Sequence, residues 1–102
     1  YEISSKRLGV TCVCDAEGKI VGIITDGDLR RAIERDGNIL YKTAKDIMTQ
    51  NPKRIRRDAL ASEAIQKMEE FSITSLLVVE ASEPEIPIGI VHIHDLLKAG
   101  AH

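Results

Sequence analysis

Short apolar runs alternate along the chain with turn residues and with longer amphipathic stretches. Runs rich in β-branched and aliphatic residues predict strands at residues 10–14, 20–25, 53–57, 75–79 and 88–92. In other segments apolar residues recur at helical spacing or follow a capping residue, which predicts helices at residues 26–36, 43–47, 61–71 and 93–99. Thr43 is the expected N-cap of the second of these helices. Short strands mixed with helices in this way predict an α+β fold.

The remaining segments have weaker patterns. Residues 1–8 are interpreted as the end of a helix, with Gly9 at the position of a left-handed C-terminal cap. Residues 49–52 are expected to be irregular. Residues 80–87 contain two prolines and are expected to form a loop.

One segment of the sequence occurs twice. Residues 22–33 read GIITDGDLRRAI, and residues 89–100 read GIVHIHDLLKAG. A Gly, an Ile, an Asp, a Leu and an Ala recur at one constant separation, which indicates a supersecondary unit used twice. We therefore expect two copies with pseudo-twofold symmetry, copy one at residues 1–42 and copy two at residues 43–102. By this alignment the sequence begins inside the first helix of copy one.

The composition limits the possible partners. The chain has 102 residues, 43% of them hydrophobic and 29% charged, with a net charge of −2, as is ordinary for a globular protein. No apolar run approaches the roughly 20 residues of a membrane span, and the net charge argues against a general nucleic-acid binder. Cys12 and Cys14 alternate in an apolar strand and are expected to be buried thiols. These observations favour a cytoplasmic protein with neither a membrane nor a nucleic acid as partner.

The repeated segment resembles the signature of the cystathionine-β-synthase (CBS) domain. In that signature a strand ends in Gly-hydrophobic-hydrophobic-Thr, and an Asp follows at the start of a helix. The opening of copy two, Met48-Thr49-x-x-Pro52, adds to the likeness. Residues 25–31 and 92–100 are similar to the C-terminal CBS pair of bacterial D-arabinose-5-phosphate isomerases. The resemblance implies tandem CBS domains whose small sheets are packed by helices.

The isomerase resemblance also has consequences for activity. Members of that family carry an N-terminal sugar-isomerase domain, which interconverts ribulose 5-phosphate and arabinose 5-phosphate for synthesis of the lipopolysaccharide sugar Kdo. No counterpart of that domain stands in this sequence. The fragment is therefore expected not to be an enzyme, and the isomerase domain of the parent chain is expected to be its partner.

Thr25 and Asp28 are the first candidate ligand residues. The resemblance implies that the Thr contacts a phosphate and the Asp contacts ribose hydroxyls. A hydroxyl beside a helix N-terminus can form an anion site, and a carboxylate can accept bonds from two neighbouring hydroxyls. The alternative is that Asp26 or Asp28 only caps the helix. The resemblance completes the wall of this site with Met48, Thr49, Pro52, Thr74 and Ser75.

A basic run lies at residues 53–57. One interpretation is a solvated edge strand whose charges discourage aggregation. A sharper hypothesis is that Lys53 or Arg54 reaches an anionic ligand at the candidate site. Binding of RNA or DNA lacks support, because no aromatic side chains interleave with the basic ones. Arg30 and Arg31 are expected to be solvated or paired with acidic residues later in the same helix.

The corresponding turn of copy two carries His92 and Asp95. We expect a second, incomplete site there, because His replaces Thr and the start of copy one is missing. His92, His94 and Asp95 could also serve as zinc or manganese ligands, which makes a metal-dependent enzyme a remote alternative. The change from strand to helix is expected to separate the two histidines. We therefore prefer a hydrogen-bonding or dimer-facing pair and assign no metal.

Together these patterns favour a regulatory ligand-binding module that requires no cofactor. The adenine nucleotides AMP, ADP and ATP are the common CBS ligands. Feedback control by a later product of the pathway would favour CMP-Kdo, the activated form of the sugar. It would offer ribose hydroxyls to Asp28, a phosphate to Thr25 and a carboxylate to Lys53 or Arg54. A homodimer of CBS pairs would transmit binding to the isomerase domain. The alternative is a purely structural oligomerisation module that binds no metabolite.

Overall fold

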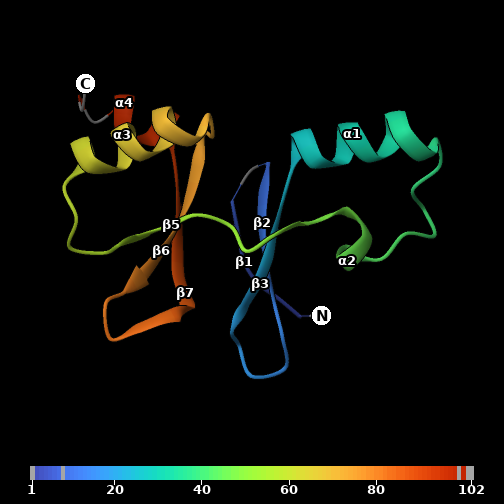
Figure 1. Ribbon diagram of the computed structural model, residues 1–102, viewed down its shortest axis with the longest axis horizontal. Coiled ribbons are helices and arrows are strands. Elements are labelled where there is room, and N and C mark those ends of the chain that lie inside the picture. The colour runs from blue at the N-terminus through green and yellow to red at the C-terminus, as the bar shows by residue number, and fades with distance from the viewer. Residues whose placement is uncertain (1, 8, 99, 101–102) are drawn as a thin grey trace. The chain divides into compact units, whose positions relative to one another are not determined.

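The computed structural model describes residues 2–7, 9–98 and 100 (Figure 1). The chain divides into two compact units, Tyr1–Pro52 and Lys53–His102. Residues 44–50 pack within the first unit, although the sequence repeat places them at the start of copy two. The boundary between residues 42 and 43 stays a prediction drawn from the repeat.

The first unit contains a four-stranded antiparallel sheet and two helices. The strands run in the order β1-β2-β3-β4. Their bounds are β1 Glu2–Arg7, β2 Val10–Cys14, β3 Ile20–Thr25 and β4 Thr49–Gln50. Helix α1, Asp26–Asp36, leads directly out of β3 (Figure 1), and the short helix α2 is Ala44–Ile47. Both helices contact β3, which places β3 at the centre of this unit.

The centre of the first sheet is apolar. The buried residues Val10, Cys12 and Val13 lie on β2, and Ile23 lies on β3. Cys12 and Cys14 are both fully buried reduced thiols with their Sγ atoms 3.8 Å apart, as the alternation in β2 predicts. Thr43 caps α2 as expected, because its hydroxyl accepts a hydrogen bond from the Asp46 backbone N–H.

Residues 2–7 form a strand, so the helix end predicted at residues 1–8 is wrong over this stretch, while residues 1 and 8 lie outside the described residues. β1 pairs antiparallel with β2 from Glu2↔Cys14 to Arg7↔Val10. Gly9 has a φ of 80° and lies in the turn between these strands, so its left-handed conformation serves a hairpin and not a helix cap. Without β1, one edge of β2 would present unpaired backbone groups, and this pairing satisfies them.

A short strand, β4, occupies a segment that was expected to be irregular. It pairs with β3 through Gly22↔Gln50 and Ile23↔Thr49. A Cβ atom on Gly22 would stand only 2.6 Å from Met48 Sδ and 2.9 Å from the Thr49 carbonyl oxygen. The absence of a side chain at Gly22 therefore allows β4 to approach β3.

The second unit contains a three-stranded sheet in the order β5-β6-β7 and two helices. β5 is Arg54–Arg56, β6 is Ser75–Glu80 and β7 is Glu83–His92, while the helices are α3 Ala61–Phe71 and α4 Ile93–Lys98. β5 runs parallel to β6, and β7 runs antiparallel to it. The core of this unit is formed by Ala64, Met68 and Leu76, against which pack Ile55, Ile73, Val91, Ile93 and Leu96.

The predicted loop at residues 80–87 is wrong for most of its length, because β7 already begins at Glu83. Pro84 and Pro87 are both tolerated since β7 is an edge strand, where a missing backbone N–H breaks no central ladder. The register also shifts at Val79, where the pairing accommodates the extra residues. Ala99, the last residue of the helix predicted at 93–99, lies outside the described residues.

Candidate ligand-binding site

The junction of β3 and α1 is organised by a capping box. Thr25 is the N-cap, and its hydroxyl accepts a hydrogen bond of 3.1 Å from the Asp28 backbone N–H. In return, Asp28 Oδ2 accepts bonds of 2.8 Å from the Thr25 backbone N–H and 3.0 Å from the Thr25 hydroxyl. The interpretation of Asp28 as a helix cap is therefore confirmed, and this pattern satisfies donors that a helix start leaves open.

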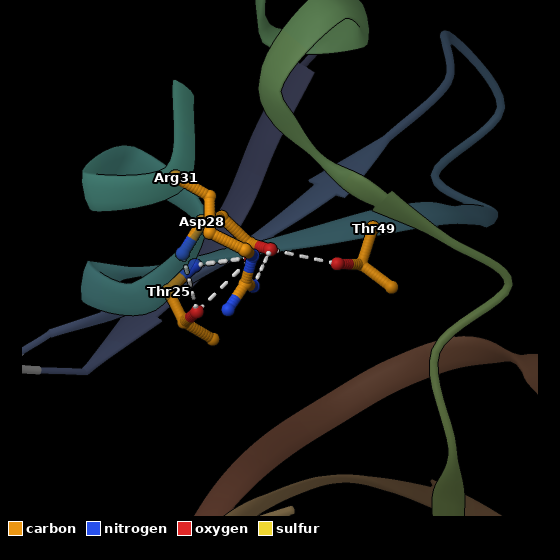
Figure 2. A network of polar contacts seen from close by, with 4 residues as sticks. All are labelled: Thr25, Asp28, Arg31 and Thr49. Atoms are coloured by element: carbon orange, nitrogen blue, oxygen red, sulfur yellow. Dashed lines mark hydrogen bonds and ion pairs between the residues drawn. The ribbon is translucent and has the colours of Figure 1, made fainter. Parts of the chain in front are cut away.

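The second carboxylate oxygen of Asp28 faces two other side chains (Figure 2). Asp28 Oδ1 accepts a bond of 2.7 Å from Arg31 Nη2 and one of 2.8 Å from the Thr49 hydroxyl. Arg31 lies one turn further along α1, whereas Thr49 belongs to β4. The carboxylate thus ties together β3, α1 and β4.

The charge of Asp28 is stabilised although the group is buried. Burial raises the pKa of the Asp28 carboxyl, but hydrogen bonds from Thr49, Thr25 and Arg31 outweigh that effect and hold the pKa below its ordinary value. The side chain is only 5% exposed. The site therefore presents an ionised carboxylate at neutral pH with hydrogen-bond donors on both of its oxygens.

Four of the predicted site residues meet around β3. Thr25 and Asp28 lie at its carboxyl end, and Thr49 binds Asp28 directly. Met48 is buried and lies close against Gly22 in the middle of the same strand. Pro52, the last residue of the first unit, is buried as well.

The middle of the basic run, Arg54–Arg56, forms β5, which is an edge strand of the second sheet, as the first interpretation predicts, while Lys53 and Arg57 flank it. Lys53 Nζ stands 4.3 Å from the centre of the Phe71 ring. The guanidinium of Arg54 donates a bond of 2.7 Å to the Pro84 carbonyl oxygen. A role of Lys53 or Arg54 in ligand binding stays a prediction.

The last two predicted residues of the wall lie at the start of β6. Ser75 is 8% exposed, and its hydroxyl has no hydrogen-bond partner within the described part of the chain. Thr74 is exposed, and its carbonyl oxygen accepts a bond of 2.8 Å from the Ile93 backbone N–H. A buried hydroxyl without a partner is unusual in a native protein and calls for an explanation.

The turn between β7 and α4 repeats part of the first junction. Asp95 Oδ2 accepts a bond of 3.2 Å from the His92 backbone N–H. The two histidine rings are stacked with centroids 4.8 Å apart, so the predicted separation of His92 from His94 is wrong. His92 Nδ1 accepts the His94 backbone N–H at 3.1 Å, because α4 begins there and folds the chain back. Among the described residues, no group of three or more His, Cys, Asp or Glu side chains is placed to hold a metal.

Sequence reasoning missed the role of Arg31. Its ion pair with Asp28 replaces the expected pairing with acidic residues later in the helix. The available signal was the spacing, since residues three apart on a helix are neighbours on its surface. Within the described residues, no helix is long and apolar enough to cross a membrane.

Comparison with known proteins identifies the class. The CBS domain family matches residues 2–35 and 44–102, so the chain belongs to this family. Its fold is similar to the crystal structure of the CBS-domain containing protein ATU1752 from Agrobacterium tumefaciens, with a TM-score of 0.81 and 28% identity over 90% of this chain and 71% of that one. A CBS domain pair is a regulatory and not a catalytic module, so we assign no reaction to the chain itself.

Two further comparisons give a relative of similar sequence and a solved structure with bound ligands. The chain is 44% identical to the arabinose 5-phosphate isomerase KdsD of Pseudomonas aeruginosa over 97% of its own length, but it spans only 30% of that relative. The CBS domain pair of protein MJ0100 has a TM-score of 0.79 and 28% identity over 90% of this chain and 69% of that one. That structure is a complex with 5′-methylthioadenosine and S-adenosyl-L-methionine.

Proposed function

We propose that the chain is the regulatory ligand-binding module of an arabinose 5-phosphate isomerase and binds a nucleotide or nucleotide-sugar. The observation that carries this proposal is the buried, ionised Asp28 at the β3–α1 junction, next to the Thr25 hydroxyl. A carboxylate accepts bonds from both hydroxyls of a ribose, and the helix start beside Thr25 favours a phosphate. The adenosine-containing ligands of MJ0100 support a nucleoside of this kind.

The identity of the nucleotide is the finer part of the proposal. AMP, ADP and ATP fit a ribose site at Asp28 and a phosphate site at Thr25. CMP-Kdo would offer both groups, and its carboxylate would be a partner for Lys53 or Arg54. The similarity to relatives named arabinose 5-phosphate isomerase KdsD is the reason for considering a ligand from Kdo synthesis for lipopolysaccharide. Feedback of this kind would act in the cytoplasm, through a homodimer of CBS pairs that influences the isomerase domain. The coupling free energy would be about 1–3 kcal/mol, as is typical between two binding sites.

Calorimetric titration with CMP-Kdo, CMP, AMP and ATP tests the proposal. We expect tight binding of at least one of these ligands and its loss in Asp28→Ala. Asp26→Ala is the matched control, because Asp26 is an exposed carboxylate in the same first turn of α1. Selective binding of CMP-Kdo would identify a feedback sensor, whereas preference for AMP or ATP would identify a sensor of energy state. Binding that survives in Asp28→Ala would contradict the assignment of the site.

The capping network also favours a second candidate function. Thr25, Arg31 and Thr49 give Asp28 a structural role that needs no ligand. A purely structural oligomerisation module would bind none of the four ligands. Deleting it from the full isomerase would then change the assembly, measured by light scattering, and leave the sensitivity of the enzyme to metabolites unchanged.

A further inference from the structure

We propose that Arg31 makes the site selective for phosphorylated ligands. In the ligand-free chain Arg31 bonds the outer oxygen of Asp28. When ribose hydroxyls take that oxygen, the guanidinium moves to the phosphate of the ligand. This inference rests on the proposed function, since it concerns the same nucleotide site.

The two oxygens of Asp28 differ in what surrounds them. Oδ2 is held by the Thr25 backbone N–H and hydroxyl, which belong to the start of α1. Oδ1 is held by two side chains that can rotate away, Arg31 and Thr49. A carboxylate oxygen offers two lone pairs, so both positions on Oδ1 are occupied. An incoming pair of ribose hydroxyls must therefore displace Arg31, Thr49 or both.

In the ion pair between Arg31 and Asp28, Arg31 is the member that can move into solvent. The Arg31 side chain is 67% exposed, whereas that of Asp28 is 5% exposed. Water can solvate the released guanidinium, but the carboxylate stays buried and loses its cation. A neutral nucleoside replaces the lost hydrogen bonds but not the lost positive charge, and so it binds against a penalty.

A phosphate on the ligand would give the Arg31 guanidinium a new anionic partner in place of Asp28. A Cβ atom placed on Gly27 would lie 3.3 Å from Arg31 Nη1 and 3.5 Å from the Thr25 hydroxyl. The guanidinium and the hydroxyl thus flank the same point over the first turn of α1. A phosphate would take the hydrogen bond that the Thr25 hydroxyl now donates to Asp28 Oδ2, which keeps the bond from the Thr25 backbone N–H. Such a phosphate would meet Arg31 there, and a guanidinium binds phosphate by two parallel hydrogen bonds. Arg31 therefore opposes neutral ligands and favours anionic ones.

The test compares the affinities for AMP and adenosine in wild type, Arg31→Gln, Arg31→Lys and Arg30→Gln. We expect Arg31→Gln to weaken the binding of AMP by at least about 10-fold. The affinity for adenosine should stay unchanged or increase. Arg31→Lys keeps the charge without the planar fork and should fall between wild type and Arg31→Gln. Arg30→Gln removes the same charge from the neighbouring position and should leave the ratio of the two affinities as in wild type.

Two outcomes separate this inference from the proposed function. If wild type binds AMP in an Asp28-dependent manner but Arg31→Gln weakens AMP and adenosine equally, Arg31 has only a structural role and the inference alone is wrong. If neither AMP nor adenosine binds to the wild-type chain, the inference is overturned together with the adenine form of the proposed function. Melting curves of each variant, recorded without ligand, show whether the β3–α1 junction still folds.

Discussion

Replacing Gly22 by alanine tests whether the site depends on the close approach of β4 to β3. The new Cβ would stand 2.6 Å from Met48 Sδ and 2.9 Å from the Thr49 carbonyl oxygen. The methionine can adopt another rotamer, but the carbonyl can only move with β4. Overpacking of this kind costs about 1–3 kcal/mol of the free energy of unfolding. The variant should therefore melt at a lower temperature, by roughly 4–8 °C for each kcal/mol lost.

The repeat supplies a matched control for this substitution. Gly89 occupies the equivalent position on β7, and a Cβ there would approach only Val78 Cβ, at an ordinary 3.9 Å. Gly89→Ala should leave stability unchanged or raise it by about 0.4–1 kcal/mol, because alanine restricts the unfolded chain. Urea denaturation followed by circular dichroism measures both variants. Equal midpoints for Gly22→Ala and Gly89→Ala would refute the steric argument.

Three further predictions concern the polar side chains of Asp28, Thr25 and Ser75. Because the folded pKa of Asp28 lies below its ordinary value, its contribution to stability is present above about pH 4 and is lost as the pH falls through the folded pKa. Thermal melts between pH 7 and pH 2.5 should show this loss in wild type, and parallel profiles in wild type and Asp28→Asn would contradict it. Thr25→Ala removes the N-cap hydroxyl and should cost about 1 kcal/mol in urea denaturation, whereas no measurable change would mean that the cap contributes nothing. Ser75→Ala removes a buried hydroxyl that has no partner among the described residues and should raise the free energy of unfolding by about 1 kcal/mol; a loss of that size would instead indicate a hidden partner such as a bound water.

The sequence was sufficient where local signals were strong. The β-branched runs at 10–14 and 20–25 and the amphipathic stretch at 61–71 are confirmed as β2, β3 and α3. The failures lie where a distant partner decides the structure. β1 depends on pairing with β2, and β4 depends on the absence of a side chain at Gly22. Neither condition can be predicted from the residues of β1 or β4 themselves.

The candidate site was predictable to a similar extent. The repeat and the resemblance located Thr25 and Asp28, and the capping box was an explicit alternative. The role of Arg31 at the site was not predicted, because its helix also carries acidic residues at positions 34 and 36. The side-chain conformation of Arg31 decides which of these acidic residues it pairs with. The sequence defines the set of possible ion pairs on a helix face, whereas the packed structure selects one of them.

Comparison of the two copies separates what the fold requires from what a ligand would require. Asp28 and Asp95 each accept the backbone N–H of the residue three positions earlier, at 2.8 Å and 3.2 Å, so this repeated carboxylate starts a helix in both copies. The shared Asp is therefore explained by capping and is not by itself evidence for a ligand. The copies differ at the residue that precedes each helix, where Thr25 stands in one copy and His92 in the other.

A second difference between the copies lies at the residues that pair with Thr25 and His92 on the neighbouring strands. Val10 pairs with Thr25, and Ser75 pairs with His92, so one buried position is apolar in copy one and polar in copy two. Nothing in the fold demands a hydroxyl there, because valine fills the same position in the other copy. The buried hydroxyl of Ser75 carries a desolvation cost that packing does not require, and its role in ligand binding stays a prediction. Within the first unit, the proposed ligand site therefore rests on the outer oxygen of Asp28, which Arg31 and Thr49 occupy, and not on the capping bond that both copies share.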